Sequence, residues 1–215
     1  MSSFLYPMLG TGLSDPQALL ADLARSADAK AQESERARRS ALAALEPALD
    51  AAASDMADAF DAGGRLFCFG KGGSATDAAG LAALFSSPAT GRSLPARSLA
   101  ADPAVLTALA NDVGVEVVFA RQLLAHGRSG DIAVGLSTSG GSANVLRALV
   151  EGRRVGMLTV GLAGYGGGAV RSCPDLQHCL AVESQSVHRT QESQSAVAHD
   201  LWQRVQSRLE GQESE

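Results

Sequence analysis

A turn rich in hydroxyl groups follows an apolar segment in the middle of the chain. The segment spans residues 132–136, and Ser137, Thr138, Ser139 and Ser142 follow it, ahead of a helical pattern. Hydroxyl and amide donors at the amino end of a helix can bind a phosphate without an arginine, because the helix dipole favours an anion there. The alternative is a flexible turn before a capped helix. We favour phosphate binding because the turn follows a predicted buried strand.

A second loop, rich in glycine, joins the apolar run 66–69 to a helical pattern over 74–85. It contains Lys71, Gly72 and Gly73. Glycines let backbone amides approach an anion closely, and the helix that follows presents its positive end to the same place. This loop is therefore a second candidate for phosphate binding. Ser74 is also a candidate helix cap, with Asp77 as its reciprocal partner.

The glycine loop also fits the loose dinucleotide-binding pattern GxGxxG/A, at Gly70, Gly72 and Ala75. That pattern usually includes an acidic residue about 20 positions further on, which holds a ribose hydroxyl. Residues 87–92 read SPATGR and contain no acid. A nicotinamide-dependent enzyme is therefore a weaker alternative to a phosphate-binding protein. No GxxxxGK[ST] motif occurs, which excludes the phosphate loop of nucleotide triphosphatases.

The last helical pattern, over residues 188–209, contains Gln191 and His199. Their spacing places both side chains on nearly one helix face, about two turns apart. A histidine in a pocket can transfer protons near neutral pH, although a lone helical histidine is more often structural.

The order of the predicted elements indicates an α/β fold. A helix is expected from near residue 15 and a long second helix over 33–62. Beyond them, short apolar runs alternate with helical patterns, which is typical of a parallel sheet covered by helices on both faces. The strands are predicted at 66–69, 132–136, 155–160 and 176–182, with a further short strand within 92–99; helices are predicted at 74–85, 103–110, 113–125, 142–152 and 188–209.

Composition limits the class of protein. With 215 residues, 46% of them hydrophobic, we expect one domain over 1–215, with amino-terminal helices over 1–63 and a parallel α/β core over 64–215. The net charge is −5, which argues against nucleic acid as a partner. No long apolar stretch or signal peptide is visible, so we expect a cytoplasmic protein with no membrane partner. Three cysteines indicate neither a disulfide framework nor a cysteine metal site. The lightly apolar first helix predicts oligomerisation.

The segments FGKGGSATDAA, LANDVGVEVVFARQL, GLSTSGGSANVLRAL and HRTQESQSAVAH occur in an order that resembles the SIS (sugar isomerase) domain family, in particular its phosphoheptose isomerase branch. The resemblance implies a three-layer α/β/α fold with a five-stranded parallel sheet, and a homotetramer or dimer with sites between subunits. It also implies aldose–ketose isomerisation of a phosphorylated sugar, such as sedoheptulose 7-phosphate, through an enediol.

The resemblance also assigns residue roles. The catalytic residues would be His199, which transfers the proton, and Gln191, which orients an oxygen in the same pocket. Lys71 stands where the family usually has asparagine, and the bulk and charge of the lysine would change the sugar that the site admits. The remaining substrate-binding positions would be Gly72, Gly73, Asn111 and Asp112 for the sugar, and Ser137, Thr138, Ser139 and Ser142 for the phosphate.

The sequence departs from the family at two positions on the helix after the glycine loop. The family has a histidine and a glutamate there, which bind zinc together with the glutamine and histidine of the last helix. This chain has Gly80 and Leu84 instead. Neither residue can bind a metal or transfer a proton. Zinc as a cofactor is therefore possible only by resemblance, and a non-catalytic SIS protein that senses a phosphosugar or binds a protein partner is the main alternative to an isomerase.

Overall fold

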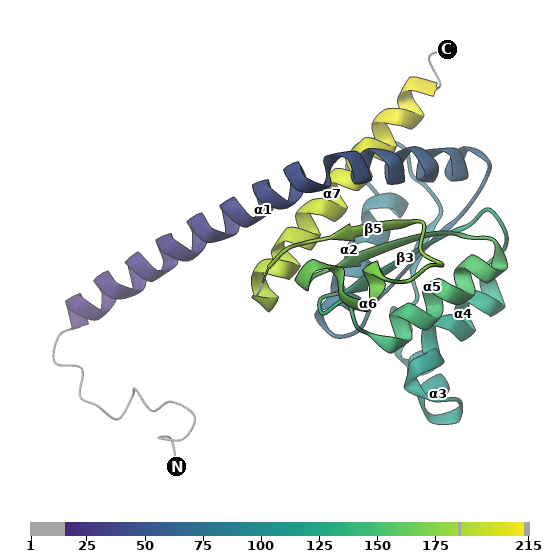
Figure 1. The fold of residues 1–215 in the computed structure, drawn as a ribbon, viewed down its shortest axis with the longest axis horizontal. Helices are drawn as coiled ribbons and strands as arrows, with labels where there is room; N and C mark the ends of the chain where they lie inside the picture. The colour runs from purple at the N-terminus through teal and green to yellow at the C-terminus, as the bar shows by residue number, and fades with distance from the viewer. Residues whose placement is uncertain (1–15, 185, 213–215) are drawn as a thin grey trace. The chain divides into compact units, whose positions relative to one another are not determined.

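The structure is a computed structural model that describes residues 16–184 and 186–212 (Figure 1). The chain forms two compact units, divided between Arg36 and Ala37. In the first unit the described residues, 16–36, are helical. The second unit contains the sheet and the remaining helices.

The chain before the sheet forms one helix, α1 (Pro16–Asp61), where two had been predicted. The expected break is absent because residues 24–33 contain neither glycine nor proline. In the second unit, Leu45, Leu49, Met56 and Phe60 of this helix are buried in the core. Their spacing is that of one helix face, as predicted.

The sheet has five parallel strands in the order β2-β1-β3-β4-β5, which confirms the predicted fold class. The direction of the strand order reverses next to β1, and in such sheets ligands bind at the carboxyl edge beside that point. Phe69 of β1 is paired with Gly135 of β3, so the loops that follow these two strands begin side by side. The strands are β1 (Leu66–Phe69), β2 (Ala96–Ser98), β3 (Ile132–Ser137), β4 (Leu158–Ala163) and β5 (His178–Ala181).

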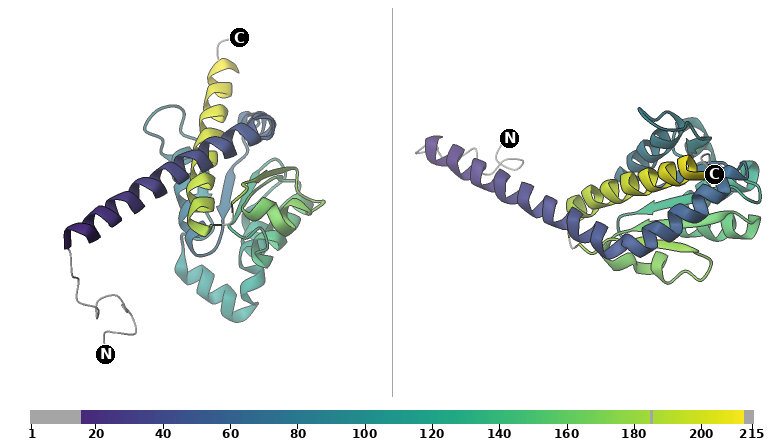
Figure 2. Two further views of the ribbon diagram at one scale, coloured as in Figure 1. Left: turned by 60° about the vertical axis from the view of Figure 1, so that its left-hand side comes forward. Right: turned by 90° about the horizontal axis from the view of Figure 1, so that it is seen from above.

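Helices cover both faces of the sheet (Figures 1 and 2). One hydrophobic core lies between the sheet and three helices, which are α2, α7 and the part of α1 over residues 41–60. A second core lies between the sheet and helices α4 and α5. No helix in the described part of the chain has the length and apolar character needed to cross a membrane. The helices after α1 are α2 (Gly73–Ser86), α3 (Pro103–Asp112), α4 (Val118–His126), α5 (Ala143–Val155), α6 (Gly168–Arg171) and α7 (Val187–Gln212), with 3-10 turns at Val115–Val117 and Tyr165–Gly167.

Several predicted boundaries were wrong, and glycines explain two of them. Gly156 takes a left-handed conformation that ends α5, so β4 starts at residue 158 and not at 155. Gly114, with φ of 98°, separates α3 from the 3-10 turn, and the helix predicted over 113–125 is therefore shorter. The strand expected within 92–99 is confined to β2, and α6 was not predicted.

Candidate functional site

The hydroxyl turn after β3 is held together by its own side chains. Ser137 ends β3 and Ser142 occupies the N-cap position of α5, and both are buried. The Ser137 Oγ donates to the Ser142 Oγ at 3.0 Å and accepts from the Ser142 backbone N–H at 3.4 Å. Gly140, with φ of 65°, donates its N–H to the Ser137 carbonyl oxygen at 3.1 Å. The turn is therefore a closed, hydrogen-bonded loop.

A side-chain hydrogen bond joins this turn to the glycine loop. The hydroxyl groups of Ser74 and Thr138 lie 3.1 Å apart. The prediction that Ser74 caps α2 is wrong, because Gly72 occupies the N-cap position and Ser74 lies inside the first turn. Its buried hydroxyl instead faces the neighbouring loop. Ser139 is exposed, and its Oγ accepts from the Gly141 N–H at 3.2 Å.

The loop after β4 packs directly against the turn. A Cβ at Gly164 would lie 2.3 Å from the Thr138 carbonyl oxygen and 2.2 Å from the Thr190 Cγ2, and a Cβ at Gly140 would lie 2.2 Å from the Gly167 carbonyl oxygen. Sequence reasoning missed Thr190, whose only signal was its position next to Gln191. It is fully buried, and its Oγ1 has no hydrogen-bond partner.

The last helix reaches the glycine loop through Gln191. A Cβ at Gly73 would lie 2.1 Å from the Gln191 Nε2, so this amide rests against the first turn of α2. The fold thus gathers residues from the loops after β1 and β3 and from the start of α7. The predicted residues that these contacts connect are Gly73, Ser74, Ser137, Thr138, Ser142 and Gln191.

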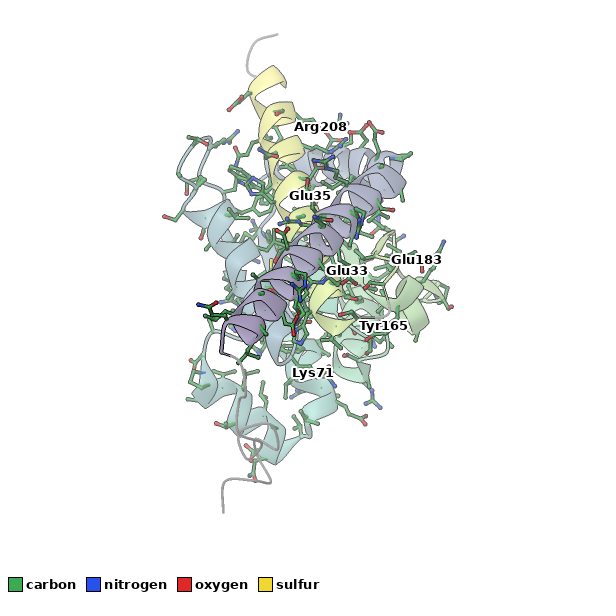
Figure 3. All side chains as sticks on the ribbon, turned by 90° about the vertical axis from the view of Figure 1, so that its left-hand side faces the viewer. Glu33, Glu35, Lys71, Tyr165, Glu183 and Arg208 are labelled. Atoms are coloured by element: carbon green, nitrogen blue, oxygen red, sulfur yellow. The ribbon has the colours of Figure 1, made fainter. Side chains whose placement is uncertain are left out.

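A cavity of about 310 Å³ opens beside these residues, between the glycine loop and the start of α5. Lys71, Gly72 and Asn144 line it together with mainly apolar side chains of α3 and α4. Lys71 is exposed. Figure 3 is viewed towards this edge of the sheet and labels Lys71 and Tyr165, which follow β1 and β4.

Three of the predicted residues make none of the contacts that join this group. Asn111 and Asp112 are exposed at the end of α3, where the Asn111 Nδ2 donates to the Asp112 Oδ1 at 2.9 Å. His199 is exposed on α7, about two turns beyond Gln191, and its ring packs on Trp202 with 5.2 Å between ring centroids. Their roles in the site remain predictions.

The donor set does not fit the zinc site that the family resemblance implies. Gly80 is exposed, with open space where a side chain would begin, and Leu84 packs against the hydrophobic core. Within residues 16–184 and 186–212, no three His, Cys, Asp or Glu side chains are grouped so that they could hold a metal ion.

One carboxylate near the glycine loop has an altered environment. Asp77, one turn beyond Gly73 on α2, is half-buried, and its Oδ2 is buried without a hydrogen-bond partner. Burial raises the pKa of Asp77 above its ordinary value, because desolvation disfavours the charged carboxylate.

Sheet order and loop positions together define a doubly wound α/β protein with its candidate site at the carboxyl edge of β1 and β3. The SIS domain model matches residues 31–164. The chain therefore belongs to the SIS domain family.

Phosphoheptose isomerases are among the similar proteins. The enzyme of Roseiflexus sp. (strain RS-1) is 44% identical over 165 residues, which are 76% of this chain and 83% of that protein. The enzyme of Chlorobaculum parvum is 42% identical over 163 residues, covering 74% and 78%. The solved phosphoheptose isomerase structure from Neisseria gonorrhoeae has a TM-score of 0.79 at 34% identity, covering 86% of this chain and 99% of that one. The corresponding structure from Francisella tularensis has a TM-score of 0.78 at 29% identity, covering 85% and 97%.

Proposed function

We propose that this chain is a sugar phosphate isomerase that anchors the phosphate of its substrate in the hydroxyl turn, residues 137–142. The observation that carries the proposal is the closed turn itself, hydrogen-bonded internally and joined to α2 through Ser74 and Thr138. Sedoheptulose 7-phosphate is the substrate to test, because the similar proteins are named phosphoheptose isomerases.

The start of α5 favours an anion. An N-cap serine usually accepts a hydrogen bond from an amide of the first turn. Ser142 makes no such bond, and its hydroxyl instead accepts from the Ser137 Oγ. The Val145 N–H is engaged by the Asn144 Oδ1 and the Ser142 carbonyl oxygen, which leaves the Ala143 and Asn144 N–H groups of the first turn for a ligand. The helix dipole adds roughly half a positive charge. The hydroxyls of Thr138 and Ser139 supply neutral donors beside them.

The sugar would extend from the phosphate towards the glycine loop. Lys71, Gly72 and Gly73 would contact it there, with Asn111 and Asp112 at its far end. The Gln191 amide, which rests on Gly73, would orient an oxygen next to the reacting carbons. Isomerisation moves a proton between adjacent carbons and another between their oxygens. His199 is proposed for the transfer between oxygens, because an imidazole exchanges protons near neutral pH.

The test is phosphorus NMR of sedoheptulose 7-phosphate with the purified protein. We expect new product resonances, their rate lowered at least tenfold by His199→Ala. Ser142→Ala should instead weaken binding at least tenfold, because it removes a ligand hydroxyl and the partner of Ser137. Ser172→Ala, at an exposed position after α6, is the matched control. Product formation that is unchanged in His199→Ala would contradict the role of His199.

A second candidate is a phosphosugar-binding protein without turnover. The observation that favours it is the absence of donor atoms at Gly80 and Leu84, where the family resemblance implies catalytic ligands. It predicts substrate resonances that broaden or shift in proportion to the protein added, with no product at any time. An unchanged spectrum would contradict both candidates for this sugar.

A further inference from the structure

One face of α2 begins beside α7, at Gly73. Gly73, Asp77, Gly80 and Leu84 recur at positions i, i+4, i+7 and i+11 of this helix, so they share one face. Gly73 touches the Gln191 amide, and the two helices pack against each other. The amino end of this face, at Gly73, therefore lies against the part of α7 that carries Gln191, with Asp77 one turn further along, whereas Gly80 faces open space.

Asp77 is the only one of these four residues with an ionisable side chain. Side chains on a helix lean towards its amino end, so the Asp77 carboxylate extends over the turn that starts at Gly73. Its Oδ2 is buried and has no hydrogen-bond partner, although carboxylate oxygens in protein interiors are normally paired. Asp77 is thus a half-buried carboxylate with one unpaired oxygen, one turn from the glycine loop, and carboxylates in perturbed environments of this kind cluster at functional sites.

We propose that Asp77 is the carboxylate that carries the proton between the two carbons of the sugar, in place of the carboxylate that Leu84 cannot supply. This assignment rests on the proposed isomerase function. The pKa of Asp77, raised by burial, supports it, because a stronger base removes a proton from carbon more readily near neutral pH.

The proposed step needs no oxidant, reductant or metal. Starting from the ketose, one Asp77 oxygen takes the proton from C1, and the C1–H electron pair forms the C1=C2 bond of an enediol. The C2 carbonyl oxygen takes a proton from His199. Asp77 then returns its proton to C2 while the O1 proton passes to His199 and C1 becomes the aldehyde. C1 is oxidised and C2 is reduced by the same electron pair, so both residues end as they began.

A purely structural role for Asp77 is the competing explanation. Gln194, on α7, is fully buried, and both of its amide atoms lack hydrogen-bond partners. A hydrogen bond donated by the Gln194 Nε2 to the Asp77 Oδ2 would give each of these two atoms a partner and serve only to hold α2 against α7. Asparagine at position 77 preserves such a bond but cannot accept a proton from carbon, so this substitution separates the two roles.

The experiment compares the wild-type protein with Asp77→Asn and Asp77→Ala on sedoheptulose 7-phosphate. Turnover is followed by phosphorus NMR, and exchange of the carbon-bound proton with deuterium oxide by proton NMR. We expect Asp77→Asn to lower kcat and the exchange rate at least 100-fold, with KM changed less than about threefold. Added formate should restore part of the activity of Asp77→Ala, because it supplies a carboxylate to the vacated space. Asp61→Asn, at the exposed end of α1, is the matched control.

Each outcome decides a different point. Retention of more than half of kcat by Asp77→Asn would overturn the assignment while leaving the isomerase in place. If Asp77→Asn folds poorly, Asp77→Ala decides, and loss of activity that formate does not restore would overturn the assignment. Neither turnover nor carbon-proton exchange in the wild type, with phosphate binding retained, would overturn the isomerase and Asp77 together and leave a binding protein.

Discussion

Single hydroxyl groups at the candidate site serve two purposes at once. A hydrogen bond joins the hydroxyls of Ser74 and Thr138, and another joins those of Ser137 and Ser142. These hydrogen bonds hold the two loops in place, and the same hydroxyls would bind an anion. Each serine or threonine hydroxyl can donate one hydrogen and accept two, so these pairs keep capacity for a ligand.

A buried carboxylate at the opposite edge of the sheet is expected to stabilise the fold. Asp131, immediately before β3, is fully buried and accepts hydrogen bonds from the Arg65 Nη2 at 2.6 Å and from the Arg65 and Arg128 backbone N–H groups at 2.9 and 3.0 Å. Burial raises the pKa of Asp131, but hydrogen bonds and charge from Arg65 outweigh that effect and hold it below the ordinary value.

Asp131→Asn should therefore lower the free energy of unfolding by about 2 kcal/mol at pH 7. The folded-state pKa is below the unfolded one, so this contribution is complete above about pH 4 and is lost as the pH falls through the folded-state pKa. Urea denaturation of both proteins at pH 7 and pH 3 measures it. A difference that does not shrink at low pH would contradict an ionic contribution.

At the scale of elements, the site depends on backbones that approach without side chains between them. Gly164 allows the end of β4 to lie against the Thr138 backbone and the Thr190 side chain. Backbone atoms cannot move aside as a flexible side chain can, so this contact tolerates no added methyl group.

Gly164→Ala should lower the free energy of unfolding by about 2 kcal/mol and weaken sugar phosphate binding, because it pushes α7 or the hydroxyl turn away. Gly80→Ala is the control: its added Cβ meets nothing within 4 Å, and alanine favours a helix by up to about 1 kcal/mol over glycine. Urea denaturation of both variants measures the free energy of unfolding, and NMR titration measures sugar phosphate binding. Equal stability of the two would show that the Gly164 contact is not close.

Zinc binding by a variant can test whether positions 80 and 84 of α2 lie close to Gln191 and His199 of α7. The family resemblance places positions 80 and 84 together with Gln191 and His199. Gly80→His combined with Leu84→Glu would add a histidine and a carboxylate to these two residues. Histidine and carboxylate side chains are usual zinc ligands, whereas the Gln191 amide is not. We expect this double variant to bind zinc at least tenfold more tightly than the wild type by calorimetry, and to lose the gain when His199→Ala is added. No gain would mean that these four positions do not converge.

At the scale of the whole molecule, we propose that the chain forms a homo-oligomer. Leu20 and Leu23, on the described helical residues of the first unit, are 65% and 56% exposed. Large apolar side chains of this kind are candidates for contact with a second copy. Sedimentation should give a mass above that of one chain. Leu20→Ser combined with Leu23→Ser should lower that mass while thermal unfolding of the core changes little; an unchanged mass would exclude this face as the contact.

The sequence alone determined the fold class and the segments that form the site, because hydrophobic periodicity and glycine placement are local signals. The parallel sheet and the hydroxyl turn after β3 were both readable from it. The single helix α1 and the shift of β4 were not, because element ends depend on individual backbone conformations.

Only the tertiary structure decided which side chains meet. The hydrogen bond between Ser74 and Thr138 and the contact of Gln191 with Gly73 join residues 64 to more than 110 positions apart. The burial of Thr190 and of the Asp77 Oδ2 depends on neighbouring elements. Such contacts follow from strand order and helix packing, which the spacing of residues along the chain does not specify. The sequence therefore indicates where a ligand would bind, and the three-dimensional fold determines which groups could act on it.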